Sequence, residues 1–339
     1  MNCGLIGYPL GHSYSPQIHR ALADYDYRLW PLKPEELEAF LARRDFAGIN
    51  VTIPYKERVI PYLDQLSDTA RAIGAVNTVV KRDGKLYGDN TDLAGMLALI
   101  RRMGLVLSGK KVLVLGTGGT SKTARAAASQ LGAAEVYRVS RSGRDGAVTY
   151  RQAEEEHRDA ACIINTTPCG MYPDLGGCPV ELDSFPCLEG VVDVIYNPLH
   201  SELVLGARQR GIPAEGGLYM LAAQAAYASA LFRGCEATAG DIELAYRTVL
   251  RQMENIVLIG MPSSGKTTVG RLLAQRTGKE FVDTDALVEQ AVGMTVPAYF
   301  AAKGESAFRE REKEAVAAAA ASGGKVIATG GGAILRPEN

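Results

Sequence analysis

The sequence has little that would attach it to a membrane or to nucleic acid. Its most apolar stretch, 218–232, is too short to cross a bilayer and contains Gln224. The formal net charge of −1 provides neither a basic surface for nucleic acid nor an attraction to anionic lipid. The chain also does not open on a basic segment followed by an apolar run, the pattern of a secretory leader. We therefore expect a cytoplasmic protein with no nucleic-acid or membrane partner.

Cysteine and histidine are scarce as well. The 339 residues include six cysteines and four histidines, and no two cysteines form a Cys-x-x-Cys pair. Cys169, Cys178 and Cys187 are evenly spaced, but no histidine accompanies them. Reduced thiols are therefore expected, in preference to disulfides or a metal site. With 47% hydrophobic and 22% charged residues, the chain otherwise has the composition of a globular protein of two or three domains.

The first positive signal is KKVLVLGTGGTSKTAR at 110–125. An apolar strand predicted at 112–115 runs into a glycine turn, and a helix-forming segment starts at Ser121. Gly116 would permit the tight turn, Gly118 a close approach to a diphosphate, and Ser121 close packing of a helix whose N-terminus attracts phosphate. The pattern favours a dinucleotide site, with an ordinary glycine-rich connection as the alternative.

The next predicted strand, 135–139, runs into Ser140-Arg141-Ser142-Gly143-Arg144. A cofactor with a free 2′-hydroxyl would need an acidic residue at about this point. Two guanidinium groups suit a 2′-phosphate instead, because each can donate paired hydrogen bonds to it. The sequence thus predicts NADP in preference to NAD, and a solvated loop with incidental charge is the alternative.

The first part of the chain alternates short strands with helices and places polar residues where these elements meet. Ser15, followed by proline, predicts a helix start, so Ser13 and Ser15 either cap that helix or hold a carboxylate at its N-terminus. Lys56 follows a strand predicted at 47–53, at the kind of strand exit where active-site groups gather, although most lysines are only surface charges. Asp92 is either a helix N-cap or a functional carboxylate.

A series of short motifs continues this pattern: HSYSP at 12–16, NVTIPYK at 50–56, GAVNT at 74–78, GDNTD at 88–92, GTGGTS at 116–121, NTTPCGM at 165–171, YNPLHS at 196–201 and GGLYMLAAQA at 216–225. Through them, residues 4–252 resemble shikimate dehydrogenase. The resemblance implies an α/β fold in which a substrate-binding domain, 1–103, is completed by helices at 216–253. A Rossmann-like NADP-binding domain at 104–215 would lie between these two segments, with the active site in the crevice between the domains.

The resemblance also implies roles for individual residues. Lys56 would supply a proton or a positive field to the alkoxide formed from 3-dehydroshikimate, and Asp92 would orient it, with no metal. Substrate would be bound at its carboxylate by Ser13, Ser15 and Tyr196 and at its hydroxyls by Thr52, Asn77, Asp92 and Gln224. NADP would be bound by Gly116, Gly118, Gly119, Thr120, Ser121, Ser140, Arg141, Arg144, Thr166 and Gly217. A dehydrogenase that prefers quinate or accepts both substrates, and a regulatory protein that binds without turnover, are the alternatives.

From residue 255 the pattern starts again. An apolar strand predicted at 256–259 precedes GMPSSGKT at 260–267, which matches the phosphate-binding loop Gly-x4-Gly-Lys-Thr. In such a loop, backbone N–H groups surround the phosphates, Lys266 reaches the outer ones and Thr267 ligates Mg²⁺. VDTD at 282–285 would place one carboxylate near the metal and one near a phosphate acceptor. As a structural alternative, only Asp285 is expected to cap the next helix.

This loop, together with FVDTD at 281–285, GESAFREREKE at 304–314 and ATGGGAI at 328–334, makes residues 255–335 resemble shikimate kinase. The resemblance implies that ATP and Mg²⁺ are bound by Gly260, Gly265, Lys266, Thr267 and Asp283, and shikimate by Asp285, Arg309 and Gly331, with Glu312 supporting Arg309. The sequence ends about half-way through that fold. We therefore expect residues 254–339 to be a partial P-loop domain that phosphorylates shikimate poorly or not at all. Small molecules are the expected partners, and the sequence leaves a homodimer open.

Overall fold

The computed structural model describes residues 1–11 and 13–339. His12, the first residue of the HSYSP motif, lies outside the described residues. The chain divides into two compact units, Met1–Val249 and Leu250–Asn339, and each has its own sheets and helices. In the described residues, no helix is both long enough and apolar enough to cross a membrane.

The first sheet of the Met1–Val249 unit is mixed and has the strand order β2-β1-β3-β5-β6-β4. Its strands are β1 (Asn2–Gly7), β2 (Asp26–Pro31), β3 (Gly48–Val51), β4 (Gln65–Leu66), β5 (Thr78–Arg82) and β6 (Lys85–Asp89). The helices in this part of the chain are α1 (Ser15–Leu22), α2 (Leu37–Arg43), α3 (Asp68–Ile73) and α4 (Thr91–Arg102). The strand predicted at 47–53 is therefore present but shorter, ending three residues before Pro54.

The second sheet of this unit is parallel and has the order β11-β10-β9-β7-β8. Its strands are β7 (Lys111–Leu115), β8 (Glu135–Val139), β9 (Cys162–Asn165), β10 (Gly190–Asp193) and β11 (Ala214–Glu215), accompanied by α5 (Gly119–Gln130), α6 (Tyr150–Glu156) and α7 (Glu202–Gln209). The residues of β7 from Val112 to Leu115 are fully buried, as expected for a parallel strand covered on both faces. Strand order reverses between β7 and β9, and such a switch point is where doubly wound sheets bind ligands. The predicted strands 112–115 and 135–139 are confirmed.

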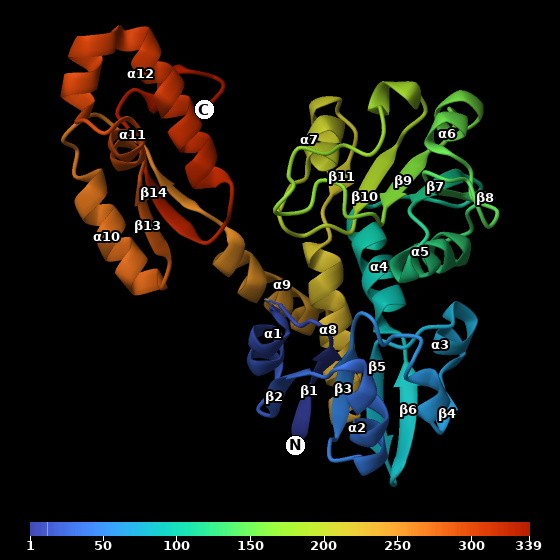
Figure 1. The fold of residues 1–339 in the computed structure, drawn as a ribbon. Helices are drawn as coiled ribbons and strands as arrows, with labels where there is room; N and C mark the ends of the chain where they lie inside the picture. The colour runs from blue at the N-terminus through green and yellow to red at the C-terminus, as the bar shows by residue number, and fades with distance from the viewer. Residues whose placement is uncertain (12) are drawn as a thin grey trace. The chain divides into compact units, whose positions relative to one another are not determined.

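Two long helices, α4 and α8 (Leu218–Arg233), lie between the two sheets of this unit (Figure 1). Gly95 of α4 allows their close approach, because a Cβ atom there would lie only 2.7 Å from the carbonyl oxygen of Met220. Towards its end, α8 buries Ala228 and Phe232 against residues of β1, β2 and β5. The first sheet is thus covered by a helix that the chain reaches only after it has formed the second sheet.

The Leu250–Asn339 unit contains a parallel three-stranded sheet with the order β12-β14-β13. Its elements are β12 (Ile256–Leu258), α10 (Lys266–Thr277), β13 (Glu280–Asp283), α11 (Thr284–Val292), α12 (Val296–Ala320) and β14 (Lys325–Ala328). Helix α9 (Ala239–Met253) runs across the division between the units, and α12 is kinked at Gly304. The central strand β14 is buried from Val326 to Ala328. The strand predicted at 256–259 is confirmed, one residue shorter.

Candidate active site and nucleotide-binding loop

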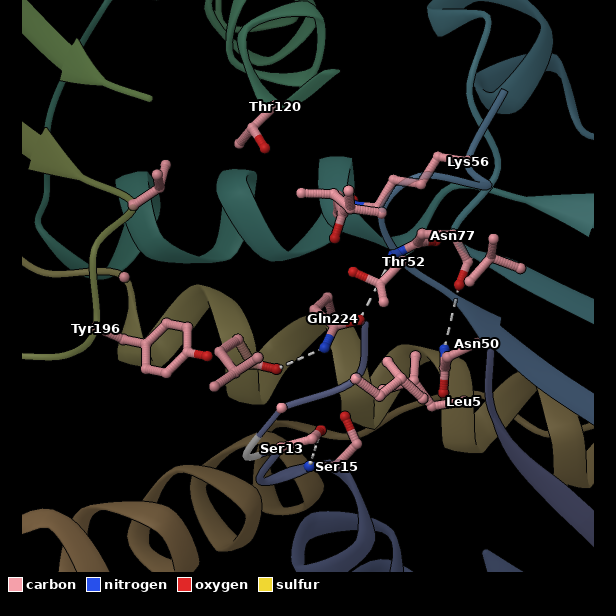
Figure 2. Close-up of a pocket in the computed structure, with 18 of the residues that line it drawn as sticks. Leu5, Ser13, Ser15, Asn50, Thr52, Lys56, Asn77, Thr120, Tyr196 and Gln224 are labelled. Atoms are coloured by element: carbon pink, nitrogen blue, oxygen red, sulfur yellow. Dashed lines mark hydrogen bonds and ion pairs between the residues drawn. The ribbon is translucent and has the colours of Figure 1, made fainter. Parts of the chain in front are cut away.

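A cavity of about 480 Å³ lies in the Met1–Val249 unit, between the ends of β3 and β10 and the start of α5 (Figure 2). It brings together residues that the sequence holds far apart. The sequence-predicted residues that line it are Ser13, Ser15, Thr52, Lys56, Asn77, Asp92, Thr120, Tyr196, Gly217 and Gln224. Its size falls within the range of small-molecule sites.

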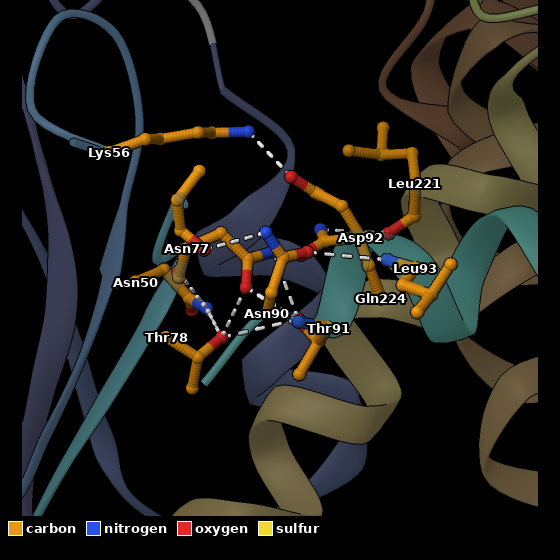
Figure 3. A network of polar contacts seen from close by, with 11 residues as sticks. Asn50, Lys56, Asn77, Thr78, Asn90, Thr91, Asp92, Leu93, Leu221 and Gln224 are labelled. Atoms are coloured by element: carbon orange, nitrogen blue, oxygen red, sulfur yellow. Dashed lines mark hydrogen bonds and ion pairs between the residues drawn. The ribbon is translucent and has the colours of Figure 1, made fainter. Parts of the chain in front are cut away.

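The charged centre of this cavity is an ion pair between Lys56 and Asp92. Lys56 Nζ donates to Asp92 Oδ2 at 2.6 Å, and the two side chains are only 25% and 13% exposed (Figure 3). Asp92 is not the N-cap of α4, because Asn90 occupies that position and its side chain accepts from the Leu93 N–H. The carboxylate of Asp92 is thus free to hold the lysine.

A buried amide network lies beside the ion pair (Figure 3). Asn77 Nδ2 donates to Thr91 Oγ1 at 3.0 Å and to Gln224 Oε1 at 3.5 Å, while Asn77 Oδ1 accepts from the Thr91 N–H. Asn50, which the sequence analysis missed, also lines the cavity and accepts from Tyr27 Oη at 2.7 Å. The signal available was a polar residue inside a buried strand, within the NVTIPYK motif. This network fixes the orientation of several hydrogen-bonding groups at the cavity wall.

Ser13 and Ser15 lie at the start of α1, where Ser13 Oγ accepts from the Ser15 N–H at 3.2 Å. The alternative in which a serine caps α1 is wrong, since α1 begins at Ser15 and its N-cap position is occupied by Tyr14. The reason is that the helical backbone starts one residue earlier than the proline suggested. Tyr196 faces the same end of the cavity, and burial raises the pKa of its phenol (Figure 2).

The glycine turn predicted to bind a diphosphate has the necessary space. Gly116 has a φ of 106°, which favours glycine, and a Cβ atom at Gly118 or Gly119 would meet nothing within 4 Å. No side chain in the described part of the chain caps the N-terminus of α5, and Ser121 Oγ donates to the Gly118 carbonyl oxygen at 2.7 Å. Free N–H groups at a helix start, next to an open glycine surface, fit a diphosphate.

The segment after β8 carries the predicted 2′-phosphate residues. Arg141 and Arg144 are exposed, and within the described residues neither one makes an ion pair. Ser140 Oγ accepts from the Gly143 N–H, which shapes the loop between them. Two unpaired guanidinium groups at this sheet edge fit a phosphate ester.

Further residues of the predicted NADP site follow β9 and β10. Thr166 Oγ1 donates to the Leu115 carbonyl oxygen, and Gly217 is the N-cap of α8 and packs directly on the backbone of Val194. The carboxylate of Asp193 is fully buried and accepts from Asn165 Nδ2, the Ile195 N–H and Ser201 Oγ.

Asn165 in turn accepts from the backbone and hydroxyl of Thr167. Asp193 therefore ties together the loops that carry Thr166 and Tyr196. The sequence analysis did not single out Asp193. Burial raises the pKa of its carboxyl group.

A second polar cavity, of about 350 Å³, surrounds the loop 260–267 in the Leu250–Asn339 unit. Lys266 Nζ donates to the carbonyl oxygens of Gly260 and Met261, both at 2.8 Å. Gly265 has a φ of 83° and is the N-cap of α10. Thr267 Oγ1 donates to Asp283 Oδ2 at 2.9 Å, so the two predicted metal ligands are in contact.

The cap of α11 differs from the expectation. Asp283, and not Asp285, is the N-cap residue, because its Oδ1 accepts from the Asp285 N–H at 3.1 Å. Asp285 lies in the first turn and lines the cavity, and burial together with the charges of Asp283 and Glu312 raises its pKa. The helix starts directly after the strand, which leaves the cap position to the last strand residue.

The remaining predicted residues lie around the glycine turn that follows β14. Gly331 lines the cavity, whereas Arg309 stands next to Gly332. Arg309 pairs with the buried Glu312 at 2.8 Å, in keeping with a supporting role for this carboxylate. Glu312 Oε1 has no hydrogen-bond partner in the described residues.

Comparison with protein families matches the two units to different families. Residues 5–79 match the family model for the shikimate dehydrogenase substrate binding domain, and residues 262–339 match the model for shikimate kinase. Over 260 residues the chain is 38% identical to the shikimate dehydrogenase (NADP(+)) of Halothermothrix orenii, covering 68% of this chain and 90% of that protein. The corresponding enzyme of Symbiobacterium thermophilum is also 38% identical, covering 66% of this chain and 86% of that protein.

Solved structures give the same result. The chorismate mutase/shikimate 5-dehydrogenase fusion protein from Clostridium acetobutylicum superposes with a TM-score of 0.70 at 30% identity, covering 73% of this chain and 96% of that one. Shikimate 5-dehydrogenase from Thermus thermophilus, in complex with NADP(H) and shikimate, superposes with a TM-score of 0.65 at 32% identity. The match covers 73% of this chain and 99% of that one. Quinate dehydrogenase from Corynebacterium glutamicum, in complex with NAD, superposes with a TM-score of 0.67 at 28% identity. The match covers 74% of this chain and 98% of that one.

Proposed function

Because the chain belongs to the shikimate dehydrogenase family, we propose that its Met1–Val249 unit catalyses the reversible, NADP-dependent reduction of 3-dehydroshikimate to shikimate. The observation that carries the proposal is the Lys56–Asp92 pair, which lies in one cavity with Thr120 of the α5 N-terminus and with the polar groups of the substrate side. The reduction needs a proton donor at the ketone oxygen, next to the cofactor, and the cavity offers a lysine there.

Lys56 provides the acid in this reaction. NADPH, when bound, supplies a hydride to the carbonyl carbon of the substrate. The carbonyl oxygen gains negative charge, and Lys56 Nζ lies at the cavity wall to stabilise that charge and to donate a proton. Asp92 holds Nζ at 2.6 Å and limits its motion, so that the ammonium group is already placed when the charge develops. In the reverse direction the neutral amine accepts the proton from the hydroxyl.

The other polar side chains orient the substrate ring. Ser13, Ser15 and Tyr196 offer hydroxyl donors at one end of the cavity, where the substrate carboxylate would bind. The ring hydroxyls would be bound by Thr52, Asn77 and Gln224. Asn77 and Gln224 are linked to each other by a hydrogen bond. A site built to hydrogen-bond hydroxyl groups discriminates strongly against analogues that lack them, because its buried polar groups would then lose their partners.

The cofactor side favours NADP. The diphosphate would bind the open glycine surface from Gly116 to Gly119 and the N-terminus of α5. The exposed guanidinium groups of Arg141 and Arg144 would bind the 2′-phosphate, a group that NAD lacks.

Steady-state oxidation of shikimate and of quinate, each with NADP and with NAD, tests this proposal. We expect the highest kcat/KM for shikimate with NADP. Comparable kcat/KM values for shikimate and quinate would favour the dual-specificity alternative. The similarity to the quinate dehydrogenase is the reason to test this alternative. Absence of turnover with all four combinations, by a protein that binds NADP, would refute an oxidoreductase and support a binding or regulatory protein.

For the Leu250–Asn339 unit we propose a site for ATP with Mg²⁺, next to a shikimate site. Support comes from the open loop 260–267, from the contact between Thr267 and Asp283, and from Asp285 and Gly331 at the same cavity. Mg²⁺ would be held by Thr267 and Asp283, and Lys266 would leave its carbonyl partners to reach the outer phosphates.

Calorimetric titration of ATP, with and without Mg²⁺, tests this second site separately from the dehydrogenase. Lys266→Ala should weaken the binding of ATP, while Lys303→Ala, which alters an exposed lysine of α12 outside the cavity lining, should not. Equal binding by the two variants would refute the assignment of the loop. A coupled assay with shikimate then measures whether phosphate is transferred.

A further inference from the structure

A third cavity, of about 330 Å³, lies in the Met1–Val249 unit and does not include the residues of the proposed active site. Its wall comes from α3, from the start of α4, from the second half of α8, from the end of α5 and from the loop after α8. Leu93, Leu97 and Leu231 provide apolar side chains, and Tyr227 adds an aromatic ring. The uncharged polar residues of the lining are Thr69, Asn90, Thr91 and Gln130. A volume of this size is at the lower end of the range for small-molecule sites.

The lining of this cavity carries a negative charge. Of the described residues that line the cavity, only Asp89 carries a charge. Its Oδ1 accepts from Ser67 Oγ at 2.6 Å and from the Asn90 N–H at 2.7 Å, while its Oδ2 has no partner among the described residues. A carboxylate in a cavity lining that contains no cationic side chain favours a cationic hydrogen-bond donor.

The cavity and the proposed active site share two helices. On α4, Asp92 lines the active site, whereas Leu93 and Leu97 line this cavity. Figure 3 shows the side chain of Leu93 pointing away from Lys56. On α8, Gln224 lines the active site and Tyr227, three residues later, lines this cavity. A ligand here would contact the turn of α4 that carries Asp92, from the side opposite the substrate.

We propose that this cavity is a binding site for a small organic ammonium ion with a flat apolar body. The ammonium group binds Oδ2 of Asp89, and the apolar body packs among Leu93, Leu231 and the ring of Tyr227. An anion is disfavoured, because it would meet the carboxylate of Asp89 with no compensating cation in the lining. This site is separate from the proposed dehydrogenase and kinase sites.

Protection of Cys235 from alkylation tests the site directly. Cys235 is exposed and lines this cavity, whereas the exposed Cys178 lies elsewhere and serves as the control in the same molecule. The full chain is treated with iodoacetamide at pH 7, and the rate at each cysteine is measured by peptide mass spectrometry. Benzylamine, a flat ammonium ion, should slow the reaction of Cys235 and leave that of Cys178 unchanged. Benzyl alcohol, which has the same ring and no charge, should protect far less.

A pair of charge-removing variants identifies the contact. Asp89→Asn should weaken protection by benzylamine at least about tenfold, since a charge-assisted hydrogen bond is lost. Asp68→Asn removes an exposed carboxylate of α3 outside the lining and should leave protection unchanged.

Two outcomes would overturn the proposal: equal protection by the amine and the alcohol, or protection that survives in Asp89→Asn. The comparison of the two ligands on the unaltered protein decides the question even when a variant fails to fold.

Discussion

The burial of His19 leads to a quantitative prediction about stability and pH. The side chain of His19 is fully buried, stacks on Tyr27 with ring centroids 3.9 Å apart, and contacts Tyr25 Oη through Nδ1 at 2.5 Å. Burial lowers the pKa of this imidazole to about 3, because the charged form would lose its hydration. The folded protein therefore keeps His19 neutral throughout the usual pH range.

The magnitude follows from the difference between the two states. In the unfolded chain a histidine has a pKa of about 6.5, so it takes up a proton at pH 5 while the folded chain does not. Since the folded pKa is the lower one, stability is fully present above pH 6.5 and is lost as the pH falls below it. At pH 5.0, protonation of His19 in the unfolded chain raises the equilibrium constant for unfolding by a factor of roughly 33. This factor corresponds to a loss of about 2 kcal/mol in the free energy of unfolding.

Urea unfolding at pH 7.5 and at pH 5.0 measures this loss. The chain has one tryptophan, Trp30 in β2, so its fluorescence reports on the Met1–Val249 unit alone. We expect that His19→Gln is less stable than the unaltered chain at pH 7.5, but loses about 2 kcal/mol less between the two pH values. His200→Gln, at an exposed histidine, is the matched control and should show the same pH dependence as the unaltered chain. Identical pH dependence in all three proteins would refute the assignment of the proton to His19.

Three further predictions concern the site. Lys56→Ala should lower kcat by about 10²- to 10⁴-fold with a much smaller change in the KM for shikimate, and a change in KM alone would reassign Lys56 to binding. Replacing both Arg141 and Arg144 by Ala should raise the KM for NADP and leave that for NAD unchanged, whereas equal weakening of both cofactors would point to a loss of fold stability. Asp193→Ala leaves three buried donors without an acceptor and should cost more than about 3 kcal/mol in urea unfolding, while Asp193→Asn should cost less. Burial raises the pKa of Asp193, so the native chain should exceed Asp193→Asn in free energy of unfolding by the largest amount at acidic pH. This difference should shrink as the pH rises through the pKa of Asp193 in the folded chain. A difference that grows with pH would contradict this account.

The parts of the fold that could be predicted are those that local sequence determines. The unbroken apolar run of β7, the glycine turn after it and the start of α5 lie within one segment. The strand was predicted to within one residue, and α5 begins at Gly119, two residues before the predicted start at Ser121. The phosphate-binding loop and β12 are local in the same sense. In such segments the hydrophobic pattern and the glycine positions already specify strand, turn and helix.

The cap of α4 was left open and the cap of α11 was assigned wrongly, because each segment offers two residues that can cap the helix. In Asn90-Thr91-Asp92 and Asp283-Thr284-Asp285, two acceptor residues compete for one cap, and the backbone conformation of a single residue decides between them. Sequence patterns place helix ends only to within a residue or two. The structure was needed to show that Asp92 is left to pair with Lys56.

Asn50 and Asp193 were missed because their importance depends on distant partners. Each lies in or at the end of an apolar strand, and the sequence does not show which partner a polar residue in such a strand meets. Asp193 receives its hydrogen bond from Asn165, 28 residues away, and Asn50 receives one from Tyr27 of a different strand. Only the pairing of the strands reveals these contacts.

The position of α8 has a consequence for the synthesis of the chain. Phe232 and Ala228 of α8 cover Leu5 and Val80 of the first sheet, yet the ribosome makes α8 only after the entire second sheet. At about 5–20 residues per second, the first sheet waits roughly 8–30 seconds for its covering helix. During that interval the apolar face around Leu5 and Val80 is exposed on the nascent chain, where it is open to chaperones and to other emerging chains. Slow translation between Val80 and Phe232 would lengthen this exposure, so the yield of soluble protein should depend on the codons of the second sheet, a part of the gene that encodes none of the exposed face.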